Sequence, residues 1–192
     1  MNKVGKLIIV VGPTGSGKSV LIEHVQNLHP ELVAPVSCTT RAMRPGEKDG
    51  TDYHFVDEAE FKRRITAGDF LEWASIDGHL YGTPKAEVVR CLKEGKTLLV
   101  DMDVQGVRQV RKSLQPDEVT TIYIDGGTWS DLEHRVRSRA PITETELMSR
   151  RKRFEYEKAF KSEADFIVKN PEGEVEQAKK DLAIVIDSLL VS

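Results

Sequence analysis

One short segment near the start of the chain restricts the possible folds more than any other. Positions 12–19 read Gly12-Pro13-Thr14-Gly15-Ser16-Gly17-Lys18-Ser19, which matches the pattern G-x-x-x-x-G-K-[ST] at every fixed position. The segment follows an apolar run at residues 7–11 and precedes another at 20–22, so it joins an expected buried strand to an expected helix. A loop in this setting binds phosphate through backbone N–H groups and the positive end of the helix dipole. The segment therefore predicts an α/β chain that binds a nucleotide.

The last two residues of this loop carry the chemistry. In such loops the lysine contacts the β- and γ-phosphates and the following hydroxyl binds Mg²⁺. Lys18 is therefore a predicted catalytic residue, and Ser19 is a predicted metal ligand. The alternative interpretation is a glycine-rich turn that binds no ligand. The predicted ATP-binding residues of the loop are Gly12, Pro13, Thr14, Gly15, Ser16, Gly17, Lys18, Ser19 and Val20.

Short apolar runs alternate with longer amphipathic ones in the rest of the chain. Residues 97–100, 119–124 and 166–168 are rich in β-branched side chains, which is typical of strands buried on both faces of a parallel sheet. Between the runs lie helical patterns, one of which has Thr83 as its expected N-cap and Pro84 at its first helical position. This alternation predicts a three-layer α/β fold around a central parallel sheet.

Two segments interrupt the alternation. Residues 36–83 are rich in Thr, Gly, Asp and aromatic side chains, and they suggest a small strand-rich insertion. Residues 127–153 hold seven basic residues in the stretches 135–139 and 150–153 against four acidic ones, in a chain whose formal charge is −3. Taken alone, that basic segment is interpreted equally well as a solvated helix face. The expected organisation is core at 1–35, insertion at 36–83, core at 84–126, a lid at 127–153 and core at 154–192.

Composition excludes several classes of protein. The near-neutral charge argues against a broad nucleic-acid-binding surface. The longest apolar runs have five or six residues, whereas a membrane helix needs about 20. Cys38 and Cys91 lie far apart and without metal-spaced neighbours, so they are expected to be buried free thiols. Free thiols and the lack of a secretory signal pattern predict a cytoplasmic protein with neither nucleic-acid nor membrane partners.

Further motifs narrow the choice among nucleotide-binding proteins. Ser37 precedes Thr39-Thr40-Arg41-Ala42-Met43-Arg44-Pro45-Gly46-Glu47, which is followed by Gly50-Thr51-Asp52-Tyr53-His54-Phe55. Then come Phe70-Leu71-Glu72-Trp73-Ala74, Gly78-His79-Leu80-Tyr81-Gly82-Thr83 and Leu99-Val100-Asp101-Met102-Asp103-Val104-Gln105-Gly106. In this order, over almost the whole chain, the motifs resemble those of guanylate kinase. The resemblance implies a P-loop core with a GMP-binding insertion and a lid, and the reaction Mg·ATP + GMP → ADP + GDP.

The resemblance also implies how GMP is held. Arg41 and Arg44 are expected to bind its phosphate, since a guanidinium group binds phosphate in a bidentate manner. Glu72 is expected to choose the base, because guanine offers two adjacent donors to one carboxylate and adenine offers an acceptor at N1. The implied GMP-binding residues are Ser37, Arg41, Arg44, Tyr53, Glu72, Tyr81, Thr83 and Asp103.

The remaining expected site residues close a strand or lie in the lid. Asp101 and Asp103 are expected to close a buried strand, with Asp101 at the metal and phosphate centre. The implied lid arginines are Arg135, Arg139 and one of Arg150 and Arg151. Asn170 is expected beside the adenine of ATP. No general base is needed, because the phosphate of GMP is already an anionic nucleophile, so catalysis is expected to rest on positioning and charge neutralisation. The catalytic residues are then Lys18, Arg41, Asp101, Arg135, Arg139, Arg150 and Arg151.

The lid departs from the family pattern. The family commonly has x-P-P-S where this chain has Asp125-Gly126-Gly127-Thr128, and Ala140 replaces a glycine. Two glycines in place of two prolines predict a more flexible connection. The insertion, lid and core are expected to close over the transferring phosphoryl group when the substrates bind.

Two other functions stay open. One is a guanylate-kinase-like module that binds peptides, and the other is a kinase for another small molecule such as a ribose bisphosphate. The complete phosphate loop argues against the first, and the set Ser37, Glu72 and Thr83 argues against the second. The expected assembly is a monomer or a homodimer whose partners are GMP and ATP, with Mg²⁺ as cofactor.

Overall fold

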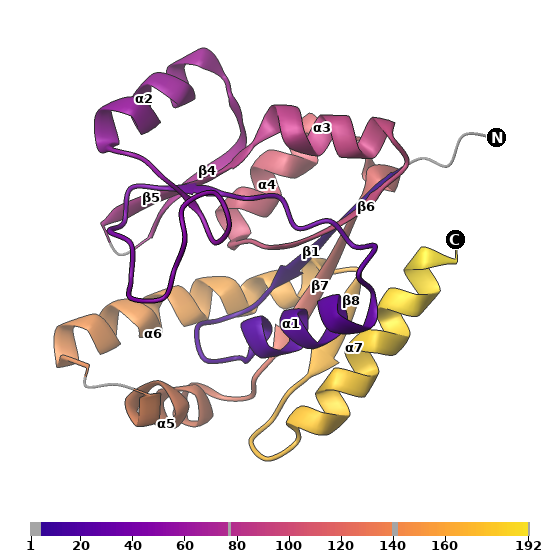
Figure 1. Ribbon diagram of the computed structural model, residues 1–192. Helices are drawn as coiled ribbons and strands as arrows, with labels where there is room; N and C mark the ends of the chain where they lie inside the picture. The colour runs from indigo at the N-terminus through magenta and orange to yellow at the C-terminus, as the bar shows by residue number, and fades with distance from the viewer. Residues whose placement is uncertain (1–4, 77, 140–141, 192) are drawn as a thin grey trace. The chain divides into compact units, whose positions relative to one another are not determined.

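The computed structural model describes residues 5–76, 78–139 and 142–191 of the 192-residue chain. By its internal contacts the chain divides into two units. The first consists of Met1–Leu7 with Leu32–Val119, and the second of Ile8–Glu31 with Thr120–Ser192. The described residues form two four-stranded sheets, with strand orders β6-β1-β7-β8 and β3-β2-β5-β4 (Figure 1).

The elements have the following bounds. The strands are β1 (Lys6–Val11), β2 (Cys38–Thr39), β3 (His54–Phe55), β4 (Phe70–Ile76), β5 (His79–Pro84), β6 (Thr97–Asp101), β7 (Val119–Asp125) and β8 (Phe166–Lys169). The helices are α1 (Lys18–Leu28), α2 (Glu58–Ala67), α3 (Lys85–Lys93), α4 (Val104–Ser113), α5 (Trp129–Arg139), α6 (Glu144–Ala159) and α7 (Val175–Leu190), and two 3₁₀ turns cover Pro116–Glu118 and Phe160–Glu163.

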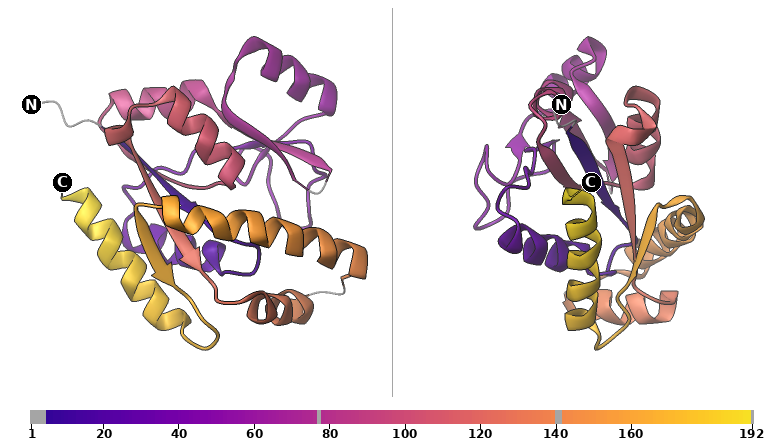
Figure 2. Two further views of the ribbon diagram at one scale, coloured as in Figure 1. Left: turned by 180° about the vertical axis from the view of Figure 1, so that it is seen from behind. Right: turned by 90° about the vertical axis from the view of Figure 1, so that its right-hand side faces the viewer.

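The strands predicted from the β-branched runs are present and are slightly longer than predicted. In β1 the residues 7–11 are fully buried. β7 and β8 pair in parallel, with Ile122 opposite Phe166 and Asp125 opposite Lys169. α7 runs alongside β8 and packs on α1, and its buried stripe is Ala178, Leu182 and Ile186 (Figures 1 and 2). The predicted α/β fold with a parallel sheet is confirmed.

The second sheet lies within residues 38–84, in the segment predicted to be a strand-rich insertion. β4 and β5 form its antiparallel hairpin, in which Glu72 lies opposite Thr83. Phe61 from α2 stacks on Phe70 with ring centroids 4.5 Å apart. Gly82 sits beside both rings, and a Cβ atom there would lie 2.9 Å from Phe70 and 3.0 Å from Phe61. The glycine therefore lets these two rings pack against the sheet.

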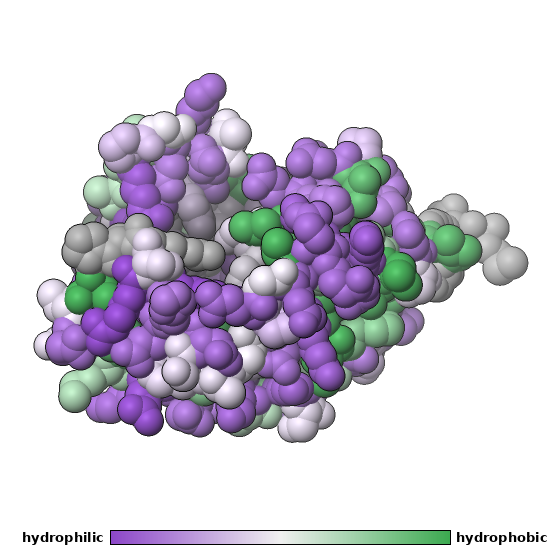
Figure 3. All heavy atoms as spheres, turned by 90° about the horizontal axis from the view of Figure 1, so that it is seen from below, coloured by the Kyte–Doolittle hydropathy of each residue, from purple (hydrophilic) through white to green (hydrophobic). Residues whose placement is uncertain are grey.

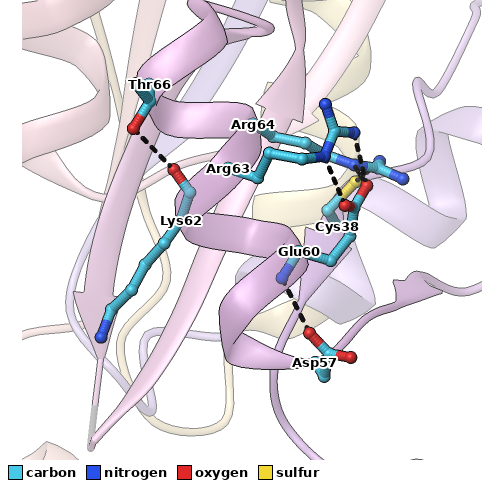
Figure 4. Close-up of polar contacts among 7 residues, drawn as sticks. All are labelled: Cys38, Asp57, Glu60, Lys62, Arg63, Arg64 and Thr66. Atoms are coloured by element: carbon cyan, nitrogen blue, oxygen red, sulfur yellow. Dashed lines mark hydrogen bonds and ion pairs between the residues drawn. The ribbon is translucent and has the colours of Figure 1, made fainter.

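α2 is tied to this sheet by charged side chains (Figure 4). Asp57 caps the helix, its carboxylate accepting from the Glu60 N–H at 2.7 Å. The Glu60 carboxylate accepts from Arg63 and Arg64. Arg64 also donates to the Cys38 Sγ at 3.2 Å, which links α2 to β2. Burial nevertheless raises the pKa of the Cys38 thiol, so this cysteine is a neutral part of the core.

Two local predictions were wrong. Thr83 is not an N-cap, because β5 continues through Pro84 and α3 begins at Lys85 with Pro84 in the capping position. The ladder with β4 instead directs the Thr83 hydroxyl to Glu72. Asp103 does not close the strand β6, which ends at Asp101. It caps α4, and its carboxylate accepts from the Gly106 N–H.

In the part of the chain that the structure describes, no helix is both long and apolar enough to cross a bilayer. The face drawn in Figure 3 is hydrophilic over most of its area, with hydrophobic residues in small groups. Cys38 and Cys91 are buried and free, as predicted.

Candidate active site

The phosphate loop connects β1 to α1 as predicted. Gly15 and Gly17 have φ angles of 88° and 92°, in the left-handed region that glycine adopts without strain. Gly12, with φ 152°, comes so close to β7 that a Cβ atom would lie 2.6 Å from the Ile124 carbonyl oxygen. The Ser16 hydroxyl is buried and has no hydrogen-bond partner among the residues described. The fixed glycines are thus required by backbone geometry.

The loop encloses an open cavity of about 520 Å³. The Lys18 ammonium group donates to the carbonyl oxygens of Gly12 and Pro13, and so bends back over the loop. The lining residues are Pro13, Thr14, Gly15, Gly17, Lys18, Ser19 and Val20. All the loop residues predicted to bind ATP except Gly12 and Ser16 therefore line one cavity.

Asn170, which follows β8, is hydrogen-bonded to the phosphate loop. Its side-chain amide donates to the Ser16 carbonyl oxygen at 2.7 Å, and its own N–H donates to the Asp125 carbonyl oxygen at 2.8 Å. Asn170 is 4% exposed. The same amide nitrogen would be the first atom met by a Cβ on Gly17. The sequence predicted a position beside the adenine, and the structure adds this direct bond to the phosphate loop.

Arg135 of α5 lies over the same part of the loop. Its guanidinium donates to the carbonyl oxygens of Gly15 at 3.3 Å and Asn170 at 3.0 Å. A second, smaller pocket of about 190 Å³ opens beside these contacts. Its lining residues are Gly15, Gly17, Val20, Arg135, Asn170, Pro171, Gly173 and Val175. One cationic side chain and one amide thus border a pocket next to the phosphate loop.

In the other unit, three predicted base-binding residues form one hydrogen-bonded group. The Thr83 hydroxyl donates to Glu72 Oε1 at 2.6 Å, across the β4–β5 ladder. The Ser37 hydroxyl lies 3.5 Å from the Thr83 hydroxyl. Glu72 is 7% exposed although it carries a carboxylate. A buried carboxylate flanked by two hydroxyls suits a ligand that brings its own donors.

Burial changes the protonation of Glu72. It raises the pKa of this carboxyl group to about 7, and the nearby Asp103 carboxylate adds to the increase. The hydrogen bond from Thr83 opposes it. Groups shifted in this way by burial and a specific neighbour are concentrated at functional sites.

The predicted phosphate-binding side chains lie close together on the same unit. Arg41 forms two hydrogen bonds to the Glu47 carboxylate, at 2.8 and 3.0 Å. Its guanidinium also lies 5.5 Å from the Tyr53 ring centroid, and that ring meets Tyr81 edge-on at 5.9 Å. The hydrogen bonds from Arg41 to Glu47 and Tyr81 raise the pKa of the guanidinium. Arg41 is thus already held by an anionic partner.

Arg44 and Asp101 are the more exposed members of this group. Arg44 contacts Glu47 through its backbone N–H, at 2.8 Å, and its side chain is exposed. Asp101 ends β6 with an exposed side chain. Within residues 5–76, 78–139 and 142–191, no three His, Cys, Asp or Glu side chains gather in a way that would hold a metal ion.

Comparison with known proteins identifies the family. A sequence model described as guanylate kinase matches residues 4–189. The chain belongs to the guanylate kinase family. It is 42% identical to the guanylate kinase of Thermosynechococcus vestitus over 166 residues, 86% of each chain, and 40% identical to that of Thermotoga maritima over 86% of this chain and 79% of the other. The crystal structure of guanylate kinase from Anaplasma phagocytophilum matches with a TM-score of 0.74 and 26% identity, over 97% of this chain and 87% of that one. The predicted family and fold are confirmed.

The departure from the guanylate kinase pattern at Gly126 and Gly127 has a packing explanation. A Cβ atom on Gly126 would lie 2.8 Å from Ser16 Cα and 2.6 Å from Leu132. Gly127 has a φ of 101°, and a Cβ there would lie 2.7 Å from Asp131. The glycines thus let the start of α5 approach the phosphate loop closely. The flexibility predicted for them stays a prediction.

The segment predicted to be the lid contains α5 and most of α6. Arg137 of α5 forms ion pairs with Glu133 of the same helix and with Glu144 of α6, both at 2.9 Å, and the second pair joins the two helices. Of the predicted lid arginines in α6, Arg150 is half-buried and Arg151 is exposed. The side chain of Arg139, at the end of α5, lies outside the described part of the chain, as does Ala140. The predicted lid boundary at 153 falls inside α6.

Glu47 contacts two predicted phosphate-binding residues, although no role was predicted for it from the sequence. It closes the motif Arg44-Pro45-Gly46-Glu47, and its carboxylate bonds both the Arg41 side chain and the Arg44 backbone. Those bonds lower the pKa of Glu47, so it is ionised at neutral pH. A carboxylate at the end of an arginine-rich motif was the available signal, but acidic residues are frequent in any solvated loop.

Proposed function

We propose that the two groups of residues described above divide the guanylate kinase reaction between them. The chain transfers the γ-phosphoryl group of ATP to GMP and yields ADP and GDP. The phosphate-loop group would hold ATP, and the group around Glu72 would hold GMP. The observation that carries this assignment is the buried Glu72 carboxylate, hydrogen-bonded to Thr83, in a chain with a complete phosphate loop.

The proposed ATP site is supported by the cavity at the phosphate loop and by the hydrogen bond from Asn170 to that loop. Backbone N–H groups of the loop would bind the phosphates, and Lys18 would exchange its bonds to the Gly12 and Pro13 carbonyl oxygens for phosphate oxygens. Asn170 would border the adenine in the smaller pocket. The proposed ATP-binding residues are Gly12, Pro13, Thr14, Gly15, Ser16, Gly17, Lys18, Ser19, Val20 and Asn170.

The GMP side rests on matching donors and acceptors. The Glu72 carboxylate would accept from guanine N1–H and the 2-amino group, with Ser37 and Thr83 completing the contacts to the base. Arg41 would release Glu47 and bind the GMP phosphate instead, because a dianionic phosphate attracts a guanidinium more strongly than one carboxylate does. The proposed GMP-binding residues are Ser37, Arg41, Arg44, Tyr53, Glu72, Tyr81, Thr83 and Asp103.

Catalysis would rest on charge neutralisation around the transferring phosphoryl group. Lys18 lines the phosphate-loop cavity, and Arg41 lies beside Tyr53 in the other group. The remaining proposed catalytic residues are Asp101, Arg135, Arg139, Arg150 and Arg151. The domain limits of 36–83 for GMP binding and 127–153 for the lid belong to the same proposal.

Magnesium would be held by few protein ligands. Ser19 at the start of α1 and Asp101 at the end of β6 offer exposed oxygen donors, which are the ligands that Mg²⁺ prefers. When bound, the ion neutralises charge on the phosphates of ATP. The lack of a cluster of three carboxylate, imidazole or thiolate ligands in the described ranges fits an ion that nucleotide phosphates largely coordinate.

The cellular setting and assembly complete the proposal. Two buried free thiols fit a reducing compartment, so we place the protein in the cytoplasm. We propose that it works as a monomer or a homodimer and binds neither nucleic acid nor membranes.

A coupled assay for ADP release tests the function. With GMP, AMP, UMP and dGMP side by side, kcat/KM should be higher for GMP than for AMP and UMP by several orders of magnitude, since buried polar atoms are left unpaired by the wrong base. dGMP carries the same base, so it reports on the sugar alone. Glu72→Gln places a donor against guanine's donors, and should lower kcat/KM for GMP about a hundredfold or more while KM for ATP stays unchanged. A variant that prefers GMP over AMP as strongly as the parent would show that Glu72 does not choose the base.

The same assay separates the alternative functions. No turnover with any monophosphate, in a folded protein, would favour the peptide-binding module. Turnover with a phosphorylated sugar but with none of the nucleotides would favour the other small-molecule kinase.

A further inference from the structure

The carboxylate of Glu72 lies against the first turn of α4. Gly106 is the third residue of that helix, and an ideal Cβ atom on it would lie 2.7 Å from Glu72 Oε2 and 3.1 Å from Glu72 Cδ. Real Cβ atoms essentially never come within 3.0 Å of another heavy atom, so the contact with Oε2 is forbidden. The present position of Glu72 is therefore compatible with glycine at position 106 and with no other residue there.

Gln109 makes a second contact between α4 and β4, one turn further along the same helix face. Its amide nitrogen donates to the Trp73 carbonyl oxygen at 2.7 Å, and its amide oxygen accepts from the Trp73 N–H at 3.2 Å. One side chain thus holds both backbone polar groups of the residue next to Glu72. This pairing fixes the position of β4 relative to α4 at Trp73, the residue next to Glu72.

Asp103 completes the surroundings of the carboxylate. It caps α4, with its Oδ1 accepting from the Gly106 N–H at 2.7 Å. Its negative charge favours the protonated form of Glu72, while the N-terminal turn of α4 carries partial positive charge that favours the ionised form. The helix end therefore influences both the place and the charge of Glu72.

We propose that Gly106 and Gln109 are positioning residues that set where the Glu72 carboxylate meets the guanine base. Neither touches the nucleotide in this proposal. Gly106 supplies the space and Gln109 the alignment of β4. The inference rests on the proposed role of Glu72 in choosing the base.

The physical reason is the narrow range of hydrogen-bond geometry. A carboxylate accepts two parallel N–H donors at about 2.7–3.2 Å, and the bonds weaken steeply when the angle departs from linear. A Cβ on residue 106 forces the buried carboxylate to move by several tenths of an ångström, since Thr83 already bonds its other oxygen at 2.6 Å. The bond to the 2-amino group of guanine is then lost or weakened, and discrimination against a base without that group falls.

Gly106→Ala is the primary test, with steady-state kinetics for GMP, IMP and ATP. IMP lacks the 2-amino group, so the ratio of kcat/KM for GMP to that for IMP reports on the carboxylate. We expect that ratio and kcat/KM for GMP to fall about tenfold or more, with KM for ATP unchanged within twofold. Alanine favours helix over glycine, so loss of helix cannot cause the effect, and thermal unfolding verifies that the variant is folded.

Gln109 supplies a second test that does not depend on how Gly106→Ala folds. Gln109→Leu removes both bonds to Trp73 and should lower the GMP-to-IMP ratio threefold to tenfold. Gln109→Glu keeps an acceptor for the Trp73 N–H but loses the donor to its carbonyl oxygen, so its ratio should fall between those of Gln109→Leu and the parent. Lys112→Ala, an exposed position on the same helix, is the control and should leave the ratio unchanged.

The outcomes separate this inference from the assignment of Glu72 itself. If Glu72→Gln abolishes the preference for GMP while Gly106→Ala and Gln109→Leu keep the ratio within twofold of the parent, the positioning role is wrong and the base-choosing role stands. If Glu72→Gln leaves the preference intact, both are wrong. Equal losses for GMP and IMP in folded variants would also overturn the positioning role, since they indicate general damage.

Discussion

At the residue scale, the buried carboxylate of Glu72 lowers the stability of the ligand-free protein. Burial raises its pKa from 4.5 to about 7. A folded-state pKa above the unfolded value means that the folded protein binds the extra proton, so this contribution to stability is complete below pH 4.5 and is lost as pH rises to about 7. The site that suits guanine is therefore destabilising in the free protein at neutral pH.

The first prediction follows from that sign. The free energy of unfolding of the ligand-free protein should fall, relative to that of Glu72→Gln, by about 3 kcal/mol between pH 4.5 and 8, since one pKa unit corresponds to about 1.4 kcal/mol. Urea unfolding of both proteins across this range measures the difference. A difference that does not vary with pH would mean that Glu72 ionises in the folded protein as freely as in the unfolded one.

Lys18 provides a second prediction at this scale. Lys18→Ala removes a cation from the phosphate loop, and kcat should fall by a factor of about 10²–10³ or more, as for other lost transition-state contacts. The fold should persist, because the lysine bonds the carbonyl oxygens of a loop that its own glycines already shape. Circular dichroism verifies folding. Near-normal kcat in a folded variant would contradict the role of Lys18.

At the scale of elements, the connection from β7 to α5 is a close contact with the phosphate loop. Gly126 lies over Ser16 with no room for a side chain, while Gly68 has a φ of 73° but nothing near its Cβ position. Gly126→Ala should destabilise the protein by about 1–3 kcal/mol through overpacking and raise KM for ATP. Gly68→Ala is the control, because an alanine there strains the backbone but meets no atom and lies away from the phosphate loop. Equal effects of both on KM for ATP would argue against the contact.

The elements were largely predictable, whereas their mutual contacts were not. The phosphate loop at 12–19, its flanking strand and helix, and the β-branched strands can be predicted from patterns of a few neighbouring residues. The bond from Asn170 to Ser16 and the pairing of Gln109 with Trp73 join residues 154 and 36 positions apart. No local pattern encodes such contacts. Thr83 shows the limit of local prediction. Its residue type favours a helix cap, but its pairing with Glu72 places it in a strand.

At the scale of the whole molecule, the reaction requires parts of the chain to meet. Lys18 follows β1, Arg41 follows β2 and Arg135 lies on α5, and all three are proposed to serve one phosphoryl group. The radius of gyration from small-angle scattering should therefore be smaller with GMP and a non-hydrolysable ATP analogue than without ligands. Closure would also keep water from the γ-phosphoryl group. An unchanged radius at saturating ligand would contradict closure and favour a rigid binding module.

The pairing of Gln109 with Trp73 has a consequence beyond this one molecule. β4 lies at an edge of its sheet, and the backbone groups of an edge strand are a template on which a second chain can add a strand. At Trp73 that template is already filled, because the glutamine amide offers one donor and one acceptor, as a neighbouring strand would. At this residue, the Gln109 side chain thus occupies the backbone groups that another strand would bind. The pair of hydrogen bonds proposed to align β4 for the base therefore also occupies this position of the sheet edge.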